Sequence, residues 1–115
     1  MGTFLKSFAI PEGVYGFRIV EAIKRMSRAG NIMWELHHRV ELNGGYNIIV
    51  GFLKITKESL FMIRNFFHSI GFSDKFEAGN WKRSDFMFQE GLLMCRQDIY
   101  RGRSINVIYD YALGD

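Results

Sequence analysis

Polar and apolar residues alternate along positions 32–42, and this pattern constrains the fold more than any other feature of the chain. One face would carry Ile32, Trp34, Leu36, His38, Val40 and Leu42, and the other Met33, Glu35, His37, Arg39 and Glu41. Successive side chains of a β-strand point to opposite sides, so the alternation predicts a strand with one buried face. Trp34 is expected in the core.

A second alternating segment, 14–24, precedes this strand. It places Tyr15, Phe17 and Ile19 on one side and Arg18, Val20 and Lys24 on the other. The first three are expected to face the core. The connecting segment 24–31 contains Lys24, Arg25 and Arg28 and no acidic residue. The two strands therefore form a hairpin with a basic turn.

Three further strands and one helix are predicted. The strands cover 46–55, 91–100 and 104–111, and two glycines before position 46 favour a tight turn. The helix begins after Thr56, a good N-cap, and ends at Gly71. Its core-facing side chains are Leu60, Ile63, Phe66, Phe67 and Ile70.

Segment 72–90 has no clear period and is expected to hold one short turn of helix near 81–86. Trp81 is predicted to anchor this segment on the barrel, with a subunit contact as the alternative.

The order of these elements predicts a fold class. Three strands, one helix and two strands is the order of the OB-fold, a mainly β, five-stranded Greek-key barrel with a helix between strands 3 and 4. Its ligand face uses strands 2 and 3, flanked by the loops 1–2 and 4–5. Here those loops are 24–31 and 100–103, and both are basic. We therefore predict one OB-fold domain over 1–115, with 1–12 as an N-terminal arm.

Composition agrees with a single globular domain. Hydrophobic residues make up 48% of the chain, and the net charge of +3 is compatible with an anionic partner without requiring one. The single cysteine, Cys95, excludes a disulfide within one chain and fits a reducing compartment. No secretory signal and no apolar run of roughly 18 residues is visible. We expect a cytoplasmic protein without a membrane partner.

No motif indicates catalysis. His37 and His38 are adjacent and point to opposite sides of a strand, and neither Cys-x-x-Cys nor His-Glu-x-x-His occurs. Glu35, His37 and Glu41 share a face and could imitate a nuclease site, but a charged outer surface is the simpler interpretation. We expect a protein that is not an enzyme and uses no metal and no cofactor, with Cys95 as a buried, inert thiol.

Several short motifs resemble a family of small bacteriophage proteins from replication and recombination regions. They are Pro11-Glu-Gly-Val-Tyr15, Ser27-Arg-Ala-Gly-Asn-Ile-Met-Trp-Glu-Leu36, the helix end Phe66-Phe-His-Ser-Ile-Gly71, and the hairpin Gly91 to Tyr100-Arg-Gly-Arg-Ser-Ile-Asn106. Together they span most of the chain. Members are similar to phage single-stranded-DNA-binding proteins. The resemblance implies an OB-fold, binding of single-stranded DNA, a part in phage replication or recombination, and a location in the host cytoplasm.

Nine residues are predicted to contact the nucleic acid. Backbone phosphates would be bound by Lys24, Arg25, Arg28, Arg39, Arg101 and Arg103. Bases would stack on Tyr46, Phe52 and Tyr100. For each basic residue the alternative is an ordinary solvated surface, and Tyr46 and Phe52 have packing as their alternative.

The partner predictions follow from the same interpretation. We expect a homo-oligomer, either a dimer or a tetramer, in which the apolar arm residues Phe4, Leu5, Phe8 and Ile10 pack on their own barrel or on a neighbouring subunit. A recombinase or replication protein is a further candidate partner. The alternative function is a protein-interaction module, an adaptor or inhibitor, that uses an OB-like barrel as its scaffold.

Overall fold

The computed structural model describes residues 8–113. Its elements are, in chain order, β1 (Gly13–Met26), β2 (Ile32–Leu42), β3 (Gly45–Lys54), the 3-10 helix η1 (Lys57–Ser59), α1 (Leu60–Ser69), α2 (Ser73–Ala78), α3 (Arg83–Phe86), β4 (Glu90–Tyr100) and β5 (Arg103–Ala112). All five expected strands are present. The mainly β class is therefore confirmed.

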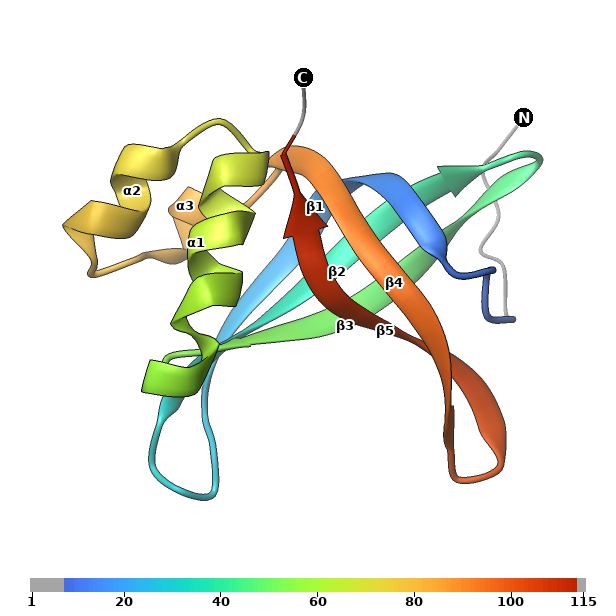
Figure 1. The fold of residues 1–115 in the computed structure, drawn as a ribbon, viewed down its shortest axis with the longest axis horizontal. Helices are drawn as coiled ribbons and strands as arrows, with labels where there is room; N and C mark the ends of the chain where they lie inside the picture. Colours follow the sequence, from blue (N-terminus) through green and yellow to red (C-terminus); the bar gives the residue numbers. More distant parts are fainter. Residues whose placement is uncertain (1–7, 114–115) are drawn as a thin grey trace.

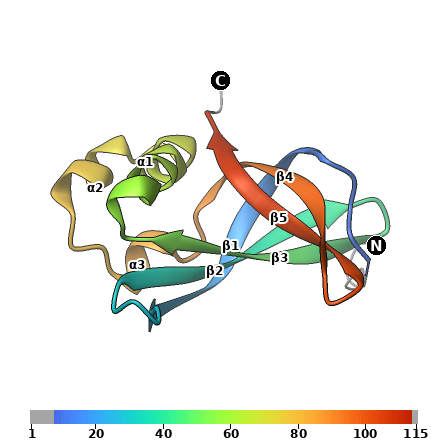
Figure 2. The same cartoon turned by 60° about the horizontal axis from the view of Figure 1, so that its bottom comes forward.

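The five strands form one antiparallel sheet in the order β3-β2-β1-β4-β5. Its edges are β3 and β5, and within residues 8–113 no ladder of hydrogen bonds joins them. The sheet nevertheless curls until the two edges approach one another. A Cβ atom on Gly51 of β3 would lie 3.1 Å from Cδ1 of Ile108 in β5. Figures 1 and 2 both show β5 passing close to β3, over a sheet that stays open in its hydrogen bonding.

The core lies inside this curl, and β2 contributes much of it. Trp34, Leu36, His38 and Val40 are all buried, which confirms the predicted inner face. Phe17 and Cys95 are buried as well, and Tyr15 packs against the cluster while half-exposed. The core is rich in aromatic rings, which come from the strands, from α1 and from Phe86 of α3.

A β-bulge interrupts β1 between Ile19 and Glu21. A bulge adds one residue and so reverses which side chains face inward beyond it. Ala22 is consequently buried. Lys24 pairs directly with Trp34, whose side chain faces the core. The prediction that Lys24 shares the outer face with Arg18 is therefore wrong, because strict alternation does not survive the bulge.

The predicted helix starts in two steps. Thr56 is extended, with φ −131°, and its side chain makes no capping hydrogen bond. The first turn is the 3-10 helix η1, and the α-helical turns begin only at Leu60. Leu60 is 38% exposed, so the prediction that it faces the core is wrong. A 3-10 turn advances by three residues instead of 3.6, which shifts the buried stripe at this end.

The end of α1 follows the sequence closely. The N–H of Phe72 donates to the carbonyl of Phe67 at 2.9 Å, and that of Gly71 donates to His68 at 3.2 Å. This is a Schellman motif, and it requires the positive φ of 83° that Gly71 adopts. Ile63, Phe66 and Phe67 are the buried residues of α1 and form its inner face.

Segment 72–90 holds two short helices, α2 and α3, where one turn was expected. The indole Nε1 of Trp81 donates to the carbonyl of Lys75 at 2.7 Å, and the ring packs near Phe67 and Phe76. Trp81 thus anchors the segment on the core cluster through Phe67 of α1, which confirms its predicted anchoring role. Figures 1 and 2 show that α1, α2 and α3 gather at one end of the sheet.

The described part of the arm lies on its own sheet. Ile10 is buried, and its N–H donates to Oδ1 of Asn106 in β5 at 2.9 Å. The carbonyl of Phe8 accepts a hydrogen bond from Nδ2 of Asn47 in β3. Residues 8–10 thus connect the two edge strands, while the Phe8 side chain is 64% exposed. The predicted packing of Phe4 and Leu5 falls outside the described residues.

Candidate nucleic-acid interface

The turn between β1 and β2 is held by its own polar groups. The N–H of Ser27 donates to the carbonyl of Asn31, and the N–H of Asn31 donates to Oγ of Ser27 at 3.1 Å. Gly30 adopts a φ of 85°, which glycine accepts without strain. Arg28 is exposed at this tip, and it forms no ion pair with any residue in 8–113.

The turn between β4 and β5 is tighter. Tyr100 pairs with Arg103, and the two residues between them, Arg101 and Gly102, have φ values of 52° and 76°. Two consecutive positive φ angles are typical of the two-residue turns that match the twist of a hairpin. The Tyr100 side chain is 57% exposed, and the Arg101 guanidinium lies 5.3 Å from the centre of its ring. This tip therefore presents one aromatic ring and two arginines to solvent.

The two basic tips extend in the same direction. In Figure 1 both lie at the bottom of the view, one at each side, whereas the β2–β3 turn lies at the upper right. Figure 2 again shows them on a common side, with β3 between them. The outward face of β2 and β3 is therefore bordered by positive charge at two places.

The outward face of β3 is more apolar than a solvated strand needs to be. It carries Tyr46, Ile48, Val50 and Phe52, followed by Lys54. Val50 is 41% and Phe52 46% exposed. Opposite them on β2 lie charged residues, with Glu35 directly across from Phe52 and Arg39 across from Ile48. The outward face thus combines an exposed aromatic ring, Phe52, with both acidic and basic side chains of β2.

Arg39 and Tyr46 form a stacked pair within this face. The Arg39 guanidinium lies 3.9 Å from the centre of the Tyr46 ring, a cation–π contact. Nε of Arg39 also donates to Oε2 of Glu41. Arg39 therefore covers one side of the tyrosine ring and shares its charge with a carboxylate.

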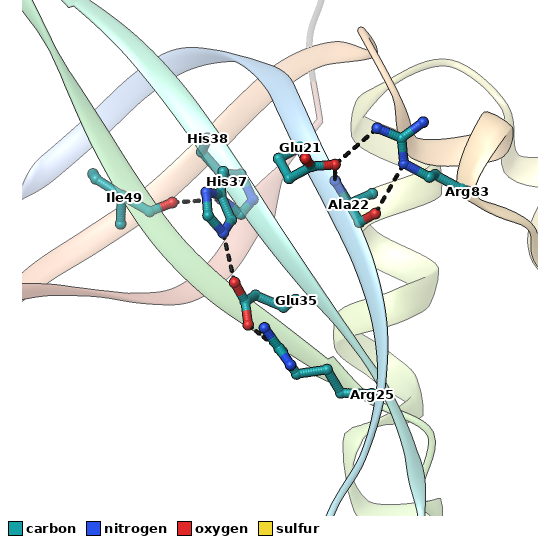
Figure 3. A network of polar contacts seen from close by, with 8 residues as sticks. All are labelled: Glu21, Ala22, Arg25, Glu35, His37, His38, Ile49 and Arg83. Atoms are coloured by element: carbon teal, nitrogen blue, oxygen red, sulfur yellow. Dashed lines mark hydrogen bonds and ion pairs between the residues drawn. The ribbon is translucent and has the colours of Figure 1, made fainter.

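Arg25 is also paired. Figure 3 shows Glu35 accepting hydrogen bonds from both Nε of Arg25 and Nε2 of His37, the latter at 2.6 Å. The His37 bond and the Arg25 bond hold the pKa of Glu35 below its usual range. Close by, Arg83 of α3 donates to Glu21 of β1 at 2.8 Å. A phosphate would have to compete with Glu35 for Arg25.

Eight of the nine predicted contact residues thus fall into three groups. The outward face of the sheet brings together Arg25, Arg39, Tyr46 and Phe52, one tip carries Arg28, and the other carries Tyr100, Arg101 and Arg103. Lys24 is exposed but leaves the sheet on the opposite side from this face.

Lys54 was missed from the sequence, although it shares the outward face. It ends β3, lies directly across from Met33 and is exposed. The alternation of β3 from Tyr46 would have revealed it. The uniformly apolar stretch 48–53 concealed that period.

The residues that could imitate a nuclease site are engaged in hydrogen bonds within the sheet instead. Glu35 and His37 are hydrogen-bonded, and Glu41 accepts from Arg39. Within the part of the chain that the structure describes, no three His, Cys, Asp or Glu side chains are grouped to hold a metal ion. Burial raises the pKa of the Cys95 thiol, as expected for an unreactive cysteine.

None of the helices in residues 8–113 combines the length and apolar character needed to cross a bilayer. No protein-family model matches this chain, and no curated protein matches it either. The geometry of the interface is therefore the basis for a functional assignment.

Proposed function

We propose that this protein is an OB-fold domain that binds single-stranded DNA without sequence preference and acts in phage DNA replication or recombination. The strand order β3-β2-β1-β4-β5, with α1 between β3 and β4, supports the fold assignment. The OB-fold is a partly open barrel, which agrees with edge strands that approach at Gly51 and Ile108 without a ladder between them. The replication or recombination role rests on the resemblance to the phage family.

One observation carries the binding proposal. The two basic hairpin tips border the outward face of β2 and β3, which is where OB-folds bind their ligands. The turn that carries Arg28 and the turn that carries Arg101, 73 positions further along the chain, lie toward the same side of the view in Figure 1. Nothing in the packing of the core requires them there.

The mechanism follows from what a single strand offers. Arginines at the tips neutralise phosphates and release counterions, which makes the affinity depend on salt. Phe52 and Tyr100 present exposed rings on which bases stack at about 1–3 kcal/mol each, with little preference among bases. Arg39, which stacks on Tyr46, presents a third planar group to the bound DNA strand.

Fluorescence anisotropy of a labelled oligo-dT, beside a duplex of equal length, tests the proposal. We expect salt-sensitive binding to the single strand and weak binding to the duplex. The absence of binding at low salt would overturn it. Reversing one arginine of each tip, in Arg28→Glu with Arg101→Glu, should weaken binding by at least about tenfold.

A matched variant controls for net charge. Arg64→Glu with Lys82→Glu changes the charge equally at exposed positions of the helical end. It should leave binding nearly unchanged. Equal losses in both variants would mean that only the overall charge matters.

Self-association belongs to the same proposal. One OB-fold covers roughly 4–16 nucleotides, so joining several copies raises the affinity for a long strand. Light scattering on eluting protein, with and without residues 1–9, measures whether a dimer or tetramer forms and whether the arm holds it together.

A protein-interaction module is the second candidate, and exposed apolar residues at the helical end favour it. Phe61 is 48%, Phe72 42% and Leu60 38% exposed. A partner held by such side chains would stay bound as salt rises, whereas DNA would dissociate. Titrations at two salt concentrations therefore separate the candidates.

A further inference from the structure

A hollow of about 370 Å³ lies where the β1–β2 turn meets the end of β3. Arg28 from the turn and Lys54 from β3 both line it. These two residues lie 26 positions apart in the chain and belong to different elements. The antiparallel pairing of Met33 with Lys54 brings them to one place.

The charge of this hollow is unbalanced. Among the residues that the structure describes, two basic side chains line it and no carboxylate does. A second hollow, over β1, β2 and β4, shows the contrast, because there Arg18 and Arg39 are accompanied by Glu41 and Glu90. The first hollow thus suits an anion, whereas the second is compensated by the protein itself.

The remaining lining is divided between hydroxyl and apolar groups. Ser27 and Thr56 contribute hydroxyls, and the Thr56 side chain makes no capping bond to η1. Ile32 and Met33 contribute apolar, half-buried surface. A ligand that fits would be charged on one side and flat and apolar on the other.

We propose that this hollow holds one nucleotide of the bound strand, with its phosphate between Arg28 and Lys54 and its base against Met33. The inference rests on the proposed function and adds a defined subsite to it. The subsite continues the outward face, since Phe52 and Lys54 point outward on the same strand. Lys54 becomes a nucleic-acid contact, and Met33 a base contact.

The methionine methyl group gives a direct readout. Protein labelled with ¹³C at its methionine methyls is titrated with thymidine 5′-monophosphate, with thymidine and with inorganic phosphate. Met33→Leu assigns the reporter signal. We expect the nucleotide to shift the Met33 signal more than thymidine or phosphate does, and Lys54→Gln to remove that difference. No shift at Met33 with the nucleotide, or the same shift in Lys54→Gln, would overturn the subsite.

Oligo-dT binding supplies the second test. Lys54→Gln should weaken binding and lower the slope of log affinity against log salt by about 0.7, the value for one phosphate contact of a single strand. Lys82→Gln, an equal charge change on an exposed lysine of the helical end, should leave both unchanged.

The two tests separate the subsite from the wider function. If wild-type protein fails to bind oligo-dT, the proposed function fails. If wild-type protein binds and Lys54→Gln binds equally well with the same salt slope, only the subsite is wrong.

Discussion

The hydroxyl of Tyr111 in β5 donates a hydrogen bond to Nε2 of His38 in β2, at 2.7 Å and inside the core. The carbonyl of Ile49 can only accept, so Nδ1 of His38, 2.9 Å away, carries the proton and Nε2 is free to accept from the tyrosine. These strands are not neighbours in the sheet. The bond therefore spans the interior and ties a central strand to an edge strand.

Stability should fall in mild acid because of His38. Its burial lowers the pKa to about 4 from 6.5, so the folded state binds fewer protons than the unfolded state between these values. The free energy of unfolding is therefore highest above pH 6.5, and it decreases by about 3 kcal/mol in total as the pH falls to 4. Urea unfolding at several pH values measures it.

Two variants test that assignment. His38→Gln should flatten the pH dependence between 6.5 and 4, whatever its own effect on stability. His68→Gln, at an exposed histidine of α1, is the matched control for the loss of one imidazole. A profile that stays steep without His38 would show that another group is responsible.

Gly51→Ala should destabilise the protein by about 1–3 kcal/mol, as overpacking of a core does. The new methyl would meet Cδ1 of Ile108 at 3.1 Å and Cε1 of His38 at 3.2 Å. Gly16→Ala is the matched control, because a methyl there meets nothing within 4 Å. Adding Ile108→Val to Gly51→Ala should recover part of the loss in thermal or urea unfolding. Equal effects of the two alanines would argue against the close approach of β3 and β5.

Removing the Glu35 charge should strengthen DNA binding. In Glu35→Gln, Arg25 loses its ionic partner and the outward face loses a negative charge. We expect a three- to tenfold gain in oligo-dT affinity at low salt, since such a charge near the surface is worth about 1 kcal/mol. The gain should shrink as salt rises. Glu77→Gln on α2 provides the control, and a gain of similar size there would refute a local effect.

Exposed aromatic rings should contribute to binding without contributing to folding. Tyr100→Ala and Phe52→Ala should each cost about 1–3 kcal/mol of binding to oligo-dT. Unfolding free energies should change little, because both side chains are about half exposed. Phe61→Ala, at a similar exposure on α1, should bind as wild type does. Wild-type affinity in both interface variants would exclude stacking on these rings.

Hydrophobic periodicity correctly predicted those parts of the fold in which inward-facing and outward-facing side chains recur at regular intervals. Trp34 and His38 are buried because β2 alternates without interruption, and α1 ends at Gly71 because only a positive φ completes its last turn. Lys24 was assigned to the wrong face because a bulge changed the parity of β1. Such a bulge depends on pairing with two neighbouring strands, which local sequence does not encode.

The sequence predicts which residues the candidate site contains, but not which of their side chains contact one another. The charges of the two tips are visible in the sequence, and so is the shared face of Glu35 and His37. That Arg25 reaches Glu35 depends on the register across the β1–β2 hairpin, which the hydrogen bonds of its turn determine. Lys54 joins the surface through the register of β3, a relation between two strands.

The hydrogen bond between Ile10 and Asn106 joins residues 96 positions apart. On a ribosome, residue 10 is made long before Asn106 exists, so the start of the described chain has no such partner until β5 has been translated. Contacts between distant parts of a chain also form slowly, because a long loop must close first. Docking of Ile10 on β5 is thus a late step in maturation, and a chain truncated before β5 would leave Ile10 without its Asn106 anchor.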